Sequence, residues 1–514
     1  MDRATQRSAS SDTSPVGAAQ AALWLTTALL CGFVLMALEL AAFRLYAPYF
    51  GYSIYVWGAM IAVMMGSLAV GYAAGGWLAD RSRSDLPLYV TILLAALYQA
   101  IILLCARAVL GNLIASGELM GSLLATLVVF ALPVAALATA GPFVTRLLAR
   151  AGHIGATAGK VNALSTAGSI GGVAATSFWI VPHWGTRAAL MIACGITASV
   201  AIAGLAARRR VAAGLGVLPV VMLLGPATLW PPHNGTILLD ESAYNLVRVV
   251  RDGDDLMLML NDGLGAQTVR NRAGISGGYY FADFGLAPLL TPVCRRVLVL
   301  GMGGGESIAS TRLVAPNASI DAVEIDGKVI GAADRFFQTR AEPGRLRIFN
   351  ADARPWLSAH TDKYDVIQVD LYHGGPYVPF HLATVEFYQS VKAHLTSGGV
   401  VVLNVFDGGR ERAILGATAA TLKSAFPAVA FYQHGYGTFV IFAFAHERPM
   451  ESLRMALSNG SLAPALAATA AHAAPELREL NVPAGAMVFT DDRAPIEEMT
   501  RQMLNEVRAK QAGG

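Results

Sequence analysis

The stretch Val297-Leu-Val-Leu-Gly-Met-Gly-Gly-Gly-Glu-Ser307 predicts a buried parallel strand that runs directly into a glycine-rich turn. A second strand pattern, Ile320-Asp-Ala-Val-Glu-Ile-Asp326, follows about twenty residues later and ends in acidic residues. This arrangement binds nucleosides, because glycines let the ligand approach the backbone and the second-strand acid accepts hydrogen bonds from ribose hydroxyls. The pattern therefore indicates a nucleoside site, with a turn of purely structural role as the alternative.

The second half of the chain predicts an α/β fold around this motif. Strand patterns alternate with helical ones from Arg295 onward, at 296–300, 319–324, 346–349, 364–369, 399–405, 428–432 and 438–443. This alternation is typical of a Rossmann-like, doubly wound sheet, which we place at 291–445. Short strands with Asp-Gly turns predict a small β-domain at 236–290. Alanine-rich stretches predict a helical extension at 446–514.

The first half has the composition of a membrane domain. Hydrophobic residues make up 54% of the 514-residue chain, and the mean hydropathy of +0.49 is too high for a soluble protein of this size. A polar tail at 1–20 is expected to be disordered. A membrane helix needs about 20 apolar residues. We therefore expect about seven transmembrane helices within 21–230, at 21–43, 54–78, 87–106, 119–140, 157–181, 187–206 and 211–229.

Charge distribution bears on location. Residues 1–230 contain 13 Lys and Arg against 6 Asp and Glu, which is typical of membrane loops rather than of nucleic-acid contacts. Seven crossings with the basic loops inside would place the second half outside the cytoplasm. Either the seventh segment does not cross, or the number of segments differs, or the chemistry is extracytoplasmic. A cytosolic nucleoside ligand favours a multi-pass inner-membrane protein with a cytoplasmic catalytic domain. The four cysteines have no metal or disulfide spacing, and we expect no metal.

Two features of the first half leave functional alternatives open. Gly71-Tyr-Ala-Ala-Gly-Gly-Trp-Leu-Ala-Asp-Arg81 resembles the loop signature of major-facilitator transporters, but it also fits a glycine-packed helix with a polar end. Glu39 lies in the first apolar segment with Arg44 near its end, and an ionisable group at membrane depth is either functional or paired with another helix.

Several motifs of the second half occur in the same order in one enzyme family. They are Glu241-Ser-Ala-Tyr-Asn245, Leu260-Asn-Asp-Gly-Leu-Gly-Ala-Gln267, the glycine loop, Val323-Glu-Ile-Asp326, Asn350-Ala-Asp-Ala353, Val369-Asp370, Glu386-Phe-Tyr388 and Tyr436-Gly-Thr-Phe439. Over about residues 236–445 the chain resembles spermidine synthases, polyamine aminopropyltransferases on the class I methyltransferase fold. The whole chain resembles membrane-fused members of this family, in which Pro379-Phe-His-Leu-Ala-Thr384 and Thr490-Asp-Asp-Arg-Ala-Pro-Ile-Glu497 recur.

The resemblance implies a transferase that moves an aminopropyl group from decarboxylated S-adenosylmethionine to a small amine, without a metal. Asp370 would be the proton acceptor, at the carboxyl end of a buried strand where such sheets bind ligands. The expected nucleoside-binding residues are Asn245, Gly301, Gly303, Gly305, Glu324, Asp352 and Ala353. The expected substrate-side residues are Gln267, Tyr280, His373 and Tyr436. Family members are often homo-oligomers, and the lipid bilayer is the other expected partner.

Polar residues of the family pattern are replaced at four positions. Gly304 stands in place of an acid that binds the aminopropyl amine, Phe281 and Ala282 replace a His and a Glu, and His373 replaces a second loop acid. Losing such carboxylates weakens binding of an ammonium. We therefore expect putrescine to be a poor substrate unless Asp283 or Asp407 compensates.

Other residues and functions remain open. His373 and His381 are either extra bases or supports of their loop, and Asp491, Asp492 and Glu497 either reach over the pocket or cap a helix. Alternative functions are a methyl or alkyl transferase that uses S-adenosylmethionine itself, and a transporter or sensor that only binds a nucleoside or polyamine.

Overall fold

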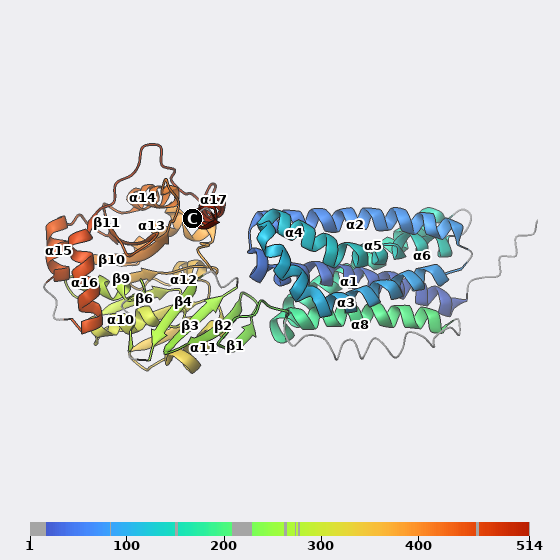
Figure 1. The fold of residues 1–514 in the computed structure, drawn as a ribbon, viewed down its shortest axis with the longest axis horizontal. Coiled ribbons are helices and arrows are strands. Elements are labelled where there is room, and N and C mark those ends of the chain that lie inside the picture. The colour runs from blue at the N-terminus through green and yellow to red at the C-terminus, as the bar shows by residue number, and fades with distance from the viewer. Residues whose placement is uncertain are drawn as a thin grey trace, which may run out of the picture. The chain divides into compact units, whose positions relative to one another are not determined.

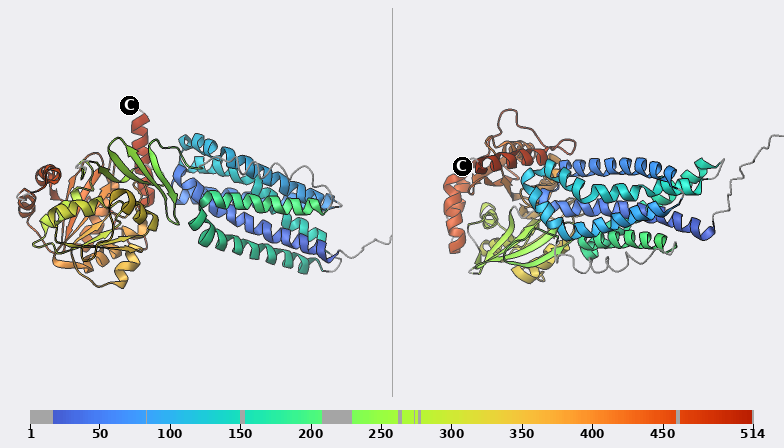
Figure 2. Two further views of the ribbon diagram at one scale, coloured as in Figure 1. Left: turned by 90° about the horizontal axis from the view of Figure 1, so that it is seen from below. Right: turned by 45° about the vertical axis from the view of Figure 1, so that its right-hand side comes forward.

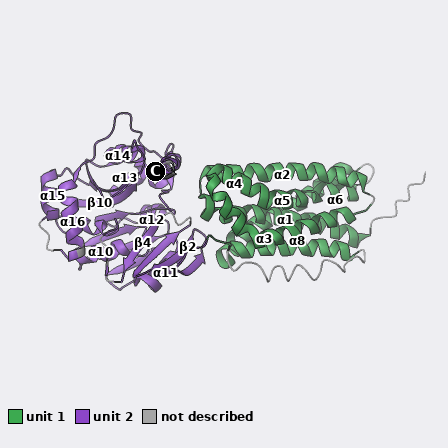
Figure 3. Ribbon diagram, viewed as in Figure 1, with its two compact units in different colours: residues 1–231 green, residues 232–514 purple. Residues whose placement is uncertain are grey.

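The computed structural model describes residues 17–82, 84–149, 153–207, 229–261, 265–272, 274–275, 278–458 and 462–512. The chain divides into two compact units, Met1–Pro231 and Pro232–Gly514 (Figure 3). Three expectations lie largely or wholly outside the described residues: the polar tail as far as residue 16, the seventh apolar segment at 211–229 except for its last residue, and the Asp-Gly turn at 262–263. Helix α1 begins at Ala18, so the end of the expected tail is helical.

Unit 1 is a bundle of long helices that run alongside one another (Figures 1 and 2). Its elements are α1 (Ala18–Phe50), α2 (Ile54–Arg81), α3 (Leu86–Leu113), η1 (Ile114–Ser116), α4 (Glu118–Thr126), η2 (Leu127–Ala131), α5 (Leu132–Ala138), α6 (Ala140–Leu148), α7 (Ile154–Ala175), η3 (Thr176–Ile180) and α8 (Val181–Ala206). Within the described residues, five helical runs are long and apolar enough to cross a membrane. The last run, Ile154–Ala206, is broken at Gly185, where φ is 80°, between the expected fifth and sixth segments.

Glycines allow the helices of unit 1 to pack closely. A Cβ added to Gly168 of α7 would lie 1.9 Å from the carbonyl oxygen of Leu29 in α1. Gly71 and Gly75 of α2 meet the backbone of α5 and of Thr139 in the same way. The whole stretch from Gly71 to Arg81 is helical, as the packed-helix alternative requires. Such contacts stabilise helix pairs in lipid, where the hydrophobic effect between helices is lost.

Unit 2 begins with a small antiparallel sheet. It consists, in order, of β1 (Thr236–Glu241), β2 (Leu246–Asp252), β3 (Asp255–Leu260), β4 (Ala266–Asn271) and β5 (Gly274–Ile275). Val247, Val249 and Leu258 of this sheet pack on Phe337 and its neighbours in α11 (Gly327–Phe337). The small sheet is thereby fixed beside the larger sheet that follows.

The main sheet has the order β13-β11-β12-β10-β9-β6-β7-β8. Its strands are β6 (Arg296–Leu300), β7 (Ser319–Glu324), β8 (Leu346–Asn350), β9 (Tyr364–Val369), β10 (Leu395–Phe406), β11 (Ala428–Gln433), β12 (Thr438–Phe444) and β13 (Arg478–Glu479). Strands β8, β7, β6, β9 and β10 are parallel, and β12 is antiparallel to β10 and β11. The predicted Rossmann-like α/β fold is confirmed.

Helices cover both faces of this sheet (Figure 1). One face packs against α12 (Ala353–Ala359), α13 (Val385–Ala393), α14 (Ala413–Ala425) and α17 (Ile496–Ala512). The other packs against η4 (Asp283–Leu290), α10 (Glu306–Val314), α15 (Met450–Ser458) and α16 (Pro464–Glu476). Burial on both faces explains why the parallel strands read as continuous apolar runs. It leaves the carboxyl ends of β6, β7, β8 and β9 as the edge where polar side chains gather.

Candidate functional site

The glycine loop after β6 requires glycine at three positions. The φ angles of Gly301, Gly303 and Gly305 are 81°, 49° and 88°, in a region that other residues rarely adopt. A Cβ on Gly301 would also lie 2.2 Å from the carbonyl oxygen of Asp370. The loop therefore packs directly against the end of β9.

Glu324 ends β7 beside this loop. One of its carboxylate oxygens accepts hydrogen bonds from the backbone N–H groups of Met302 and Gly303, at 3.2 and 3.3 Å, and the other accepts one from Asp326 at 3.1 Å. Burial raises the pKa of Glu324 to about 7, although these hydrogen bonds act in the opposite direction. A carboxylate held in this way against the glycine loop is placed to accept ribose hydroxyls.

Asp370 follows β9 and faces Tyr280. The Tyr280 hydroxyl donates to the carboxylate, with its oxygen 3.2 and 3.3 Å from the two carboxylate oxygens. Burial raises the pKa of Asp370 to about 7, the Tyr280 hydrogen bond opposes this, and the charge of Glu324 adds to it. The two acids therefore act on each other electrostatically at one edge of the sheet.

The segment after β8 provides a wall next to Glu324. Asp352 caps α12 by accepting a hydrogen bond from the backbone N–H of Arg354 at 3.0 Å, and Ala353 is buried. The Asn350 amide donates to the carbonyl oxygens of Glu324 and Ile325. Asp352 thus has a capping role in the structure, beside its expected role in nucleoside binding.

Asn245 lies in a buried polar network. Its amide NH₂ donates to Asp326 at 2.8 Å, and its oxygen accepts from Asn261 at 2.9 Å. The Asn261 amide also donates to the carbonyl oxygen of His373 at 3.0 Å. Both ends of the Asn245 amide therefore contact protein groups, and the network joins the small sheet to the loop that follows Asp370.

The remaining substrate-side residues are less closely gathered. Gln267 is half-buried on β4. Its backbone carbonyl oxygen lies 3.3 Å from where a Cβ on Gly303 would be. Tyr436 is 63% exposed in the turn between β11 and β12, and its hydroxyl donates to the carbonyl oxygen of Gly408 at 3.3 Å. Of the four expected substrate-side residues, the structure brings the side chain of Tyr280 to Asp370.

The acids that were expected to compensate are engaged elsewhere. Asp283 is fully buried, and one of its carboxylate oxygens lies 2.6 Å from Nδ1 of His434. Asp407 accepts hydrogen bonds from the backbone N–H groups of Gly409 and Leu415, both at 3.0 Å. Both carboxylates therefore have structural partners, and neither replaces the missing family acids.

Sequence reasoning missed two contacts of the site. Thr268 accepts a hydrogen bond from the backbone N–H of Gly304 at 2.8 Å. Arg270 pairs with Glu306, directly after the glycine loop, at 2.7 Å. The only signal was two opposite charges far apart in the sequence, which does not specify a pair.

Asp491, one acid of the C-terminal motif, contacts two other elements. Asp491 forms a bidentate ion pair with Arg354, at 2.9 and 2.5 Å, and accepts a hydrogen bond from Thr384 at 2.7 Å. These contacts lower the pKa of Asp491, with the Arg354 hydrogen bond as the main cause. Asp491 thus joins the start of α12 to the start of α13.

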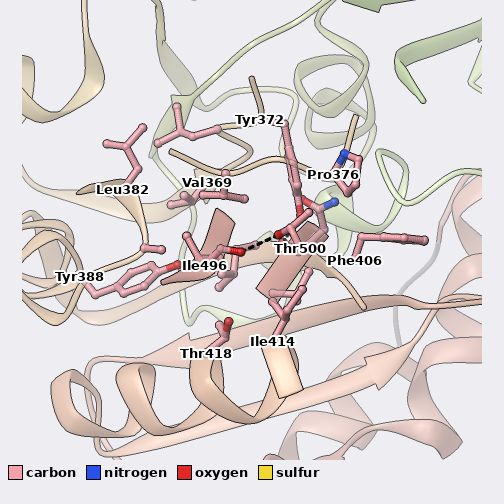
Figure 4. Close-up of a pocket in the computed structure, with 16 residues that line it drawn as sticks. Val369, Tyr372, Pro376, Leu382, Tyr388, Phe406, Ile414, Thr418, Ile496 and Thr500 are labelled. Carbon is pink, nitrogen blue, oxygen red and sulfur yellow. Dashed lines mark hydrogen bonds between the residues drawn. The ribbon is translucent and has the colours of Figure 1, made fainter. Parts of the chain in front are cut away.

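A small apolar cavity lies on the α13, α14 and α17 side of the sheet (Figure 4). Val369 and Tyr372 line it from the chain on either side of Asp370, and Thr500 lines it from α17, where its hydroxyl donates to the carbonyl oxygen of Ile496 at 2.8 Å. The Tyr372 hydroxyl donates to the carbonyl oxygen of Asn404 at 3.1 Å. The loop that carries His373 therefore forms part of the wall of the cavity.

Comparisons with known proteins find a matching domain model and several relatives. Residues 284–440 match the spermine/spermidine synthase domain model. The chain is 31% identical over 301 residues to a probable polyamine aminopropyl transferase of Bifidobacterium longum, covering 53% of this chain and 64% of the relative. It is 26% identical over 378 residues to a polyamine aminopropyltransferase of Mycobacterium tuberculosis, covering 68% of each. The chain thus spans slightly less than two thirds of the first relative.

Other similarities are weaker. A human eEF1A lysine and N-terminal methyltransferase is 29% identical over 150 residues, covering 27% of this chain and 21% of the relative. A crystal structure of a probable spermidine synthase from Corynebacterium glutamicum matches with a TM-score of 0.40 and 18% identity, covering 51% of this chain and 97% of the other. The spermidine synthase of Thermotoga maritima matches with a TM-score of 0.37 and 20% identity, over 45% of this chain and 80% of the other.

Proposed function

Because residues 284–440 match the spermine/spermidine synthase domain model, we propose that the chain is an aminopropyltransferase with Asp370 as its general base. The donor would be decarboxylated S-adenosylmethionine and the acceptor a small amine. The observation that carries the proposal is the Asp370 carboxylate, which is hydrogen-bonded by Tyr280 and has a pKa of about 7.

The chemistry needs little more than orientation and a base. The acceptor nitrogen forms a bond to the carbon beside the sulfonium, the carbon–sulfur bond breaks, and methylthioadenosine leaves. The charged Asp370 carboxylate first attracts the protonated amine and then accepts its proton, which leaves a neutral amine as the nucleophile. A pKa near 7 suits this role, because a base is most effective when its pKa lies near the working pH.

The nucleoside would be held on the other side of the site. Glu324 would accept the ribose hydroxyls, and the turn at Asp352 and Ala353 would contact the adenine. The glycine loop would allow close approach of the sulfur-bearing end of the donor. This division would place the reactive carbon between Glu324 and Asp370.

The acceptor site is proposed to bind putrescine less well than a monoamine. Position 304 has no carboxylate, Ala282 is fully buried, and Asp283 and Asp407 are already partnered. A diamine needs a second anionic group for its distal ammonium. Asp370 is the acid proposed for the reacting amine, and no second acid is assigned to the distal ammonium.

A second candidate is transfer of a methyl or alkyl group from S-adenosylmethionine itself. It is favoured by the absence of an acid at Gly304, because the intact donor carries a carboxylate that an acid there would repel. The proposed base and nucleoside positions would be shared by both reactions.

We also propose that unit 1 anchors the chain in the inner membrane, with unit 2 in the cytoplasm. The five apolar helical runs support the membrane location, and the cytosolic origin of the proposed donor supports the orientation. Protease accessibility in oriented membrane vesicles would test the side of the membrane that carries unit 2.

The decisive experiment uses the full chain purified in detergent. Decarboxylated and intact S-adenosylmethionine are each supplied with a panel of monoamines and diamines, and the products are identified by mass spectrometry. Aminopropylated amine together with methylthioadenosine is the expected result. Methylated product supports the second candidate, and tight methylthioadenosine binding without turnover would overturn both.

A further inference from the structure

His434 follows β11 and faces acceptors with both ring nitrogens. Nδ1 lies 2.6 Å from a carboxylate oxygen of Asp283, and Nε2 lies 3.3 Å from the carbonyl oxygen of Gly278. The side chain of His434 is 17% exposed and that of Asp283 is fully buried, so water competes little for these contacts. The two acceptors lie on one short segment, 278–283.

Two acceptors are fully satisfied only by an imidazolium ring. A neutral imidazole has one N–H, so one nitrogen would present a lone pair to an oxygen. Burial acts to lower the pKa of His434, but the Asp283 carboxylate and the Gly278 carbonyl outweigh it and raise the pKa above its ordinary value. The other polar side chains around this pair are Tyr432 on β11, which interacts with Asp283, and His472 on α16, which packs edge-on against Tyr432.

The segment that His434 holds carries Tyr280. The segment is also held at Phe281, whose carbonyl oxygen accepts a hydrogen bond from Ser310 at 3.1 Å. The Tyr280 hydroxyl then reaches Asp370. Of these ties, His434 is the one that carries an imidazole, and its pKa is raised above the ordinary value by the Asp283 carboxylate and the Gly278 carbonyl against the effect of burial.

We infer that His434 is a positioning residue, whose protonated ring clamps the segment 278–283 so that the Tyr280 hydroxyl faces Asp370. The catalytic consequence rests on the proposed function. His434 acts through Tyr280 and does not itself contact the reacting atoms. Loss of its second proton at alkaline pH releases one of the two ties and loosens the segment.

Activity assays on four variants of the full chain test this role. His434→Phe removes both ties, and we expect kcat to fall by at most about tenfold, the loss expected for Tyr280→Phe, while methylthioadenosine affinity stays unchanged. His434→Gln retains a neutral donor and should keep more activity, but lose the decline of kcat at alkaline pH. Because the clamp acts through Tyr280, His434→Phe should add little to Tyr280→Phe in the double variant. Full additivity, or an alkaline decline in His434→Gln equal to that of the wild type, would overturn the inference.

A second readout does not depend on turnover. Hydrogen exchange of peptides covering 278–284 is compared at about pH 6.5 and about pH 8.5, after correction for intrinsic rates. In the wild type, the segment 278–284 should exchange faster at the higher pH. In His434→Gln, its exchange should not depend on pH in this way. Equal pH responses would overturn the clamp. A wild type that exchanges as expected but has no transferase activity would instead contradict the proposed function.

Discussion

Thr268 occupies the space in which a side chain at position 304 would begin. Its hydroxyl accepts a hydrogen bond from the backbone N–H of Gly304 at 2.8 Å, and its methyl group lies 2.7 Å from where a Cβ on Gly304 would be. Phe337 closes the same space from α11 at 3.0 Å. Thr268 and Phe337 therefore leave little room for the side chain of an acid at position 304.

Restoring the family acid alone should fail. Gly304→Asp is expected to cost about 1–3 kcal/mol of stability through overpacking and to leave putrescine turnover low. Thr268→Ser removes the obstructing methyl group and keeps the hydroxyl, so the double variant should regain stability and raise kcat/KM for putrescine about tenfold. Thermal unfolding and putrescine kinetics measure both effects. An unchanged melting temperature for Gly304→Asp would show that the space is open.

Asp370→Asn separates chemistry from binding. The amide keeps the shape but cannot accept the proton, so turnover should fall about 10²- to 10⁴-fold. Methylthioadenosine affinity, measured by calorimetry, should change little, because this nucleoside lacks the reacting group. Tyr280→Phe is the milder comparison, with an expected loss of about tenfold from one hydrogen bond. Retention of full activity by Asp370→Asn would remove Asp370 from the mechanism.

The pH dependence has a defined sign. Asp370 must be unprotonated to act, so kcat/KM should rise with pH through about 7. The pKa values of Asp370 and Glu324 are raised in the folded protein, so their contribution to stability is full below the ordinary carboxyl value and is lost as pH rises through about 7. In the ligand-free protein at about pH 8, Asp370→Asn should therefore raise the melting temperature by about 2–4 °C. A lower melting temperature would contradict the buried-charge explanation.

Glu324→Gln tests the nucleoside side. Replacing the charged acceptor should weaken methylthioadenosine binding about 10- to 100-fold, the range for hydrogen bonds to a charged group. The 2′-deoxy analogue provides the control, because it has lost one of the hydroxyls concerned. The wild type should discriminate strongly between the two ligands and the variant much less. Equal discrimination by both proteins would place the ribose elsewhere.

Helix packing in unit 1 is tested with a matched pair of glycines in α7. Gly168→Ala would place a methyl group 1.9 Å from the Leu29 carbonyl oxygen, whereas the same change at Gly159 meets nothing within 4 Å. We expect Gly168→Ala to reduce thermal stability in detergent by about 1–3 kcal/mol or more. Gly159→Ala should be neutral or stabilising, because alanine favours helix by up to about 1 kcal/mol. Identical melting curves would contradict the close α1–α7 contact.

The sequence predicted those parts of the site that depend on strand ends. Gly301, Glu324 and Asp370 each follow a buried apolar run, and parallel strands bring such positions to one edge. Local patterns are sufficient there because the sheet geometry supplies the long-range information. The same logic predicted the Rossmann-like fold but not the break at Gly185, since glycine alone does not specify a positive φ.

Contacts between distant side chains could not be predicted in this way. Asp283 was considered as a substitute for the missing acids, yet it is buried against His434, a partner that no spacing indicates. Asn245 was expected to bind the nucleoside, but its contacts depend on how β2 packs on α11. Such pairs depend on three-dimensional packing, which local patterns in a single sequence do not predict.

The ion pair between Arg354 and Asp491 has a practical consequence for cutting the chain into fragments. The match to the synthase domain model ends at residue 440, yet Asp491 holds the first turn of α12 and the cap of α13 from well beyond that point. A truncation at the edge of the similarity would leave a guanidinium and a threonine hydroxyl without their acceptor, next to the expected adenine wall. The smallest fragment worth expressing should therefore extend beyond the region matched by the domain model and include Asp491.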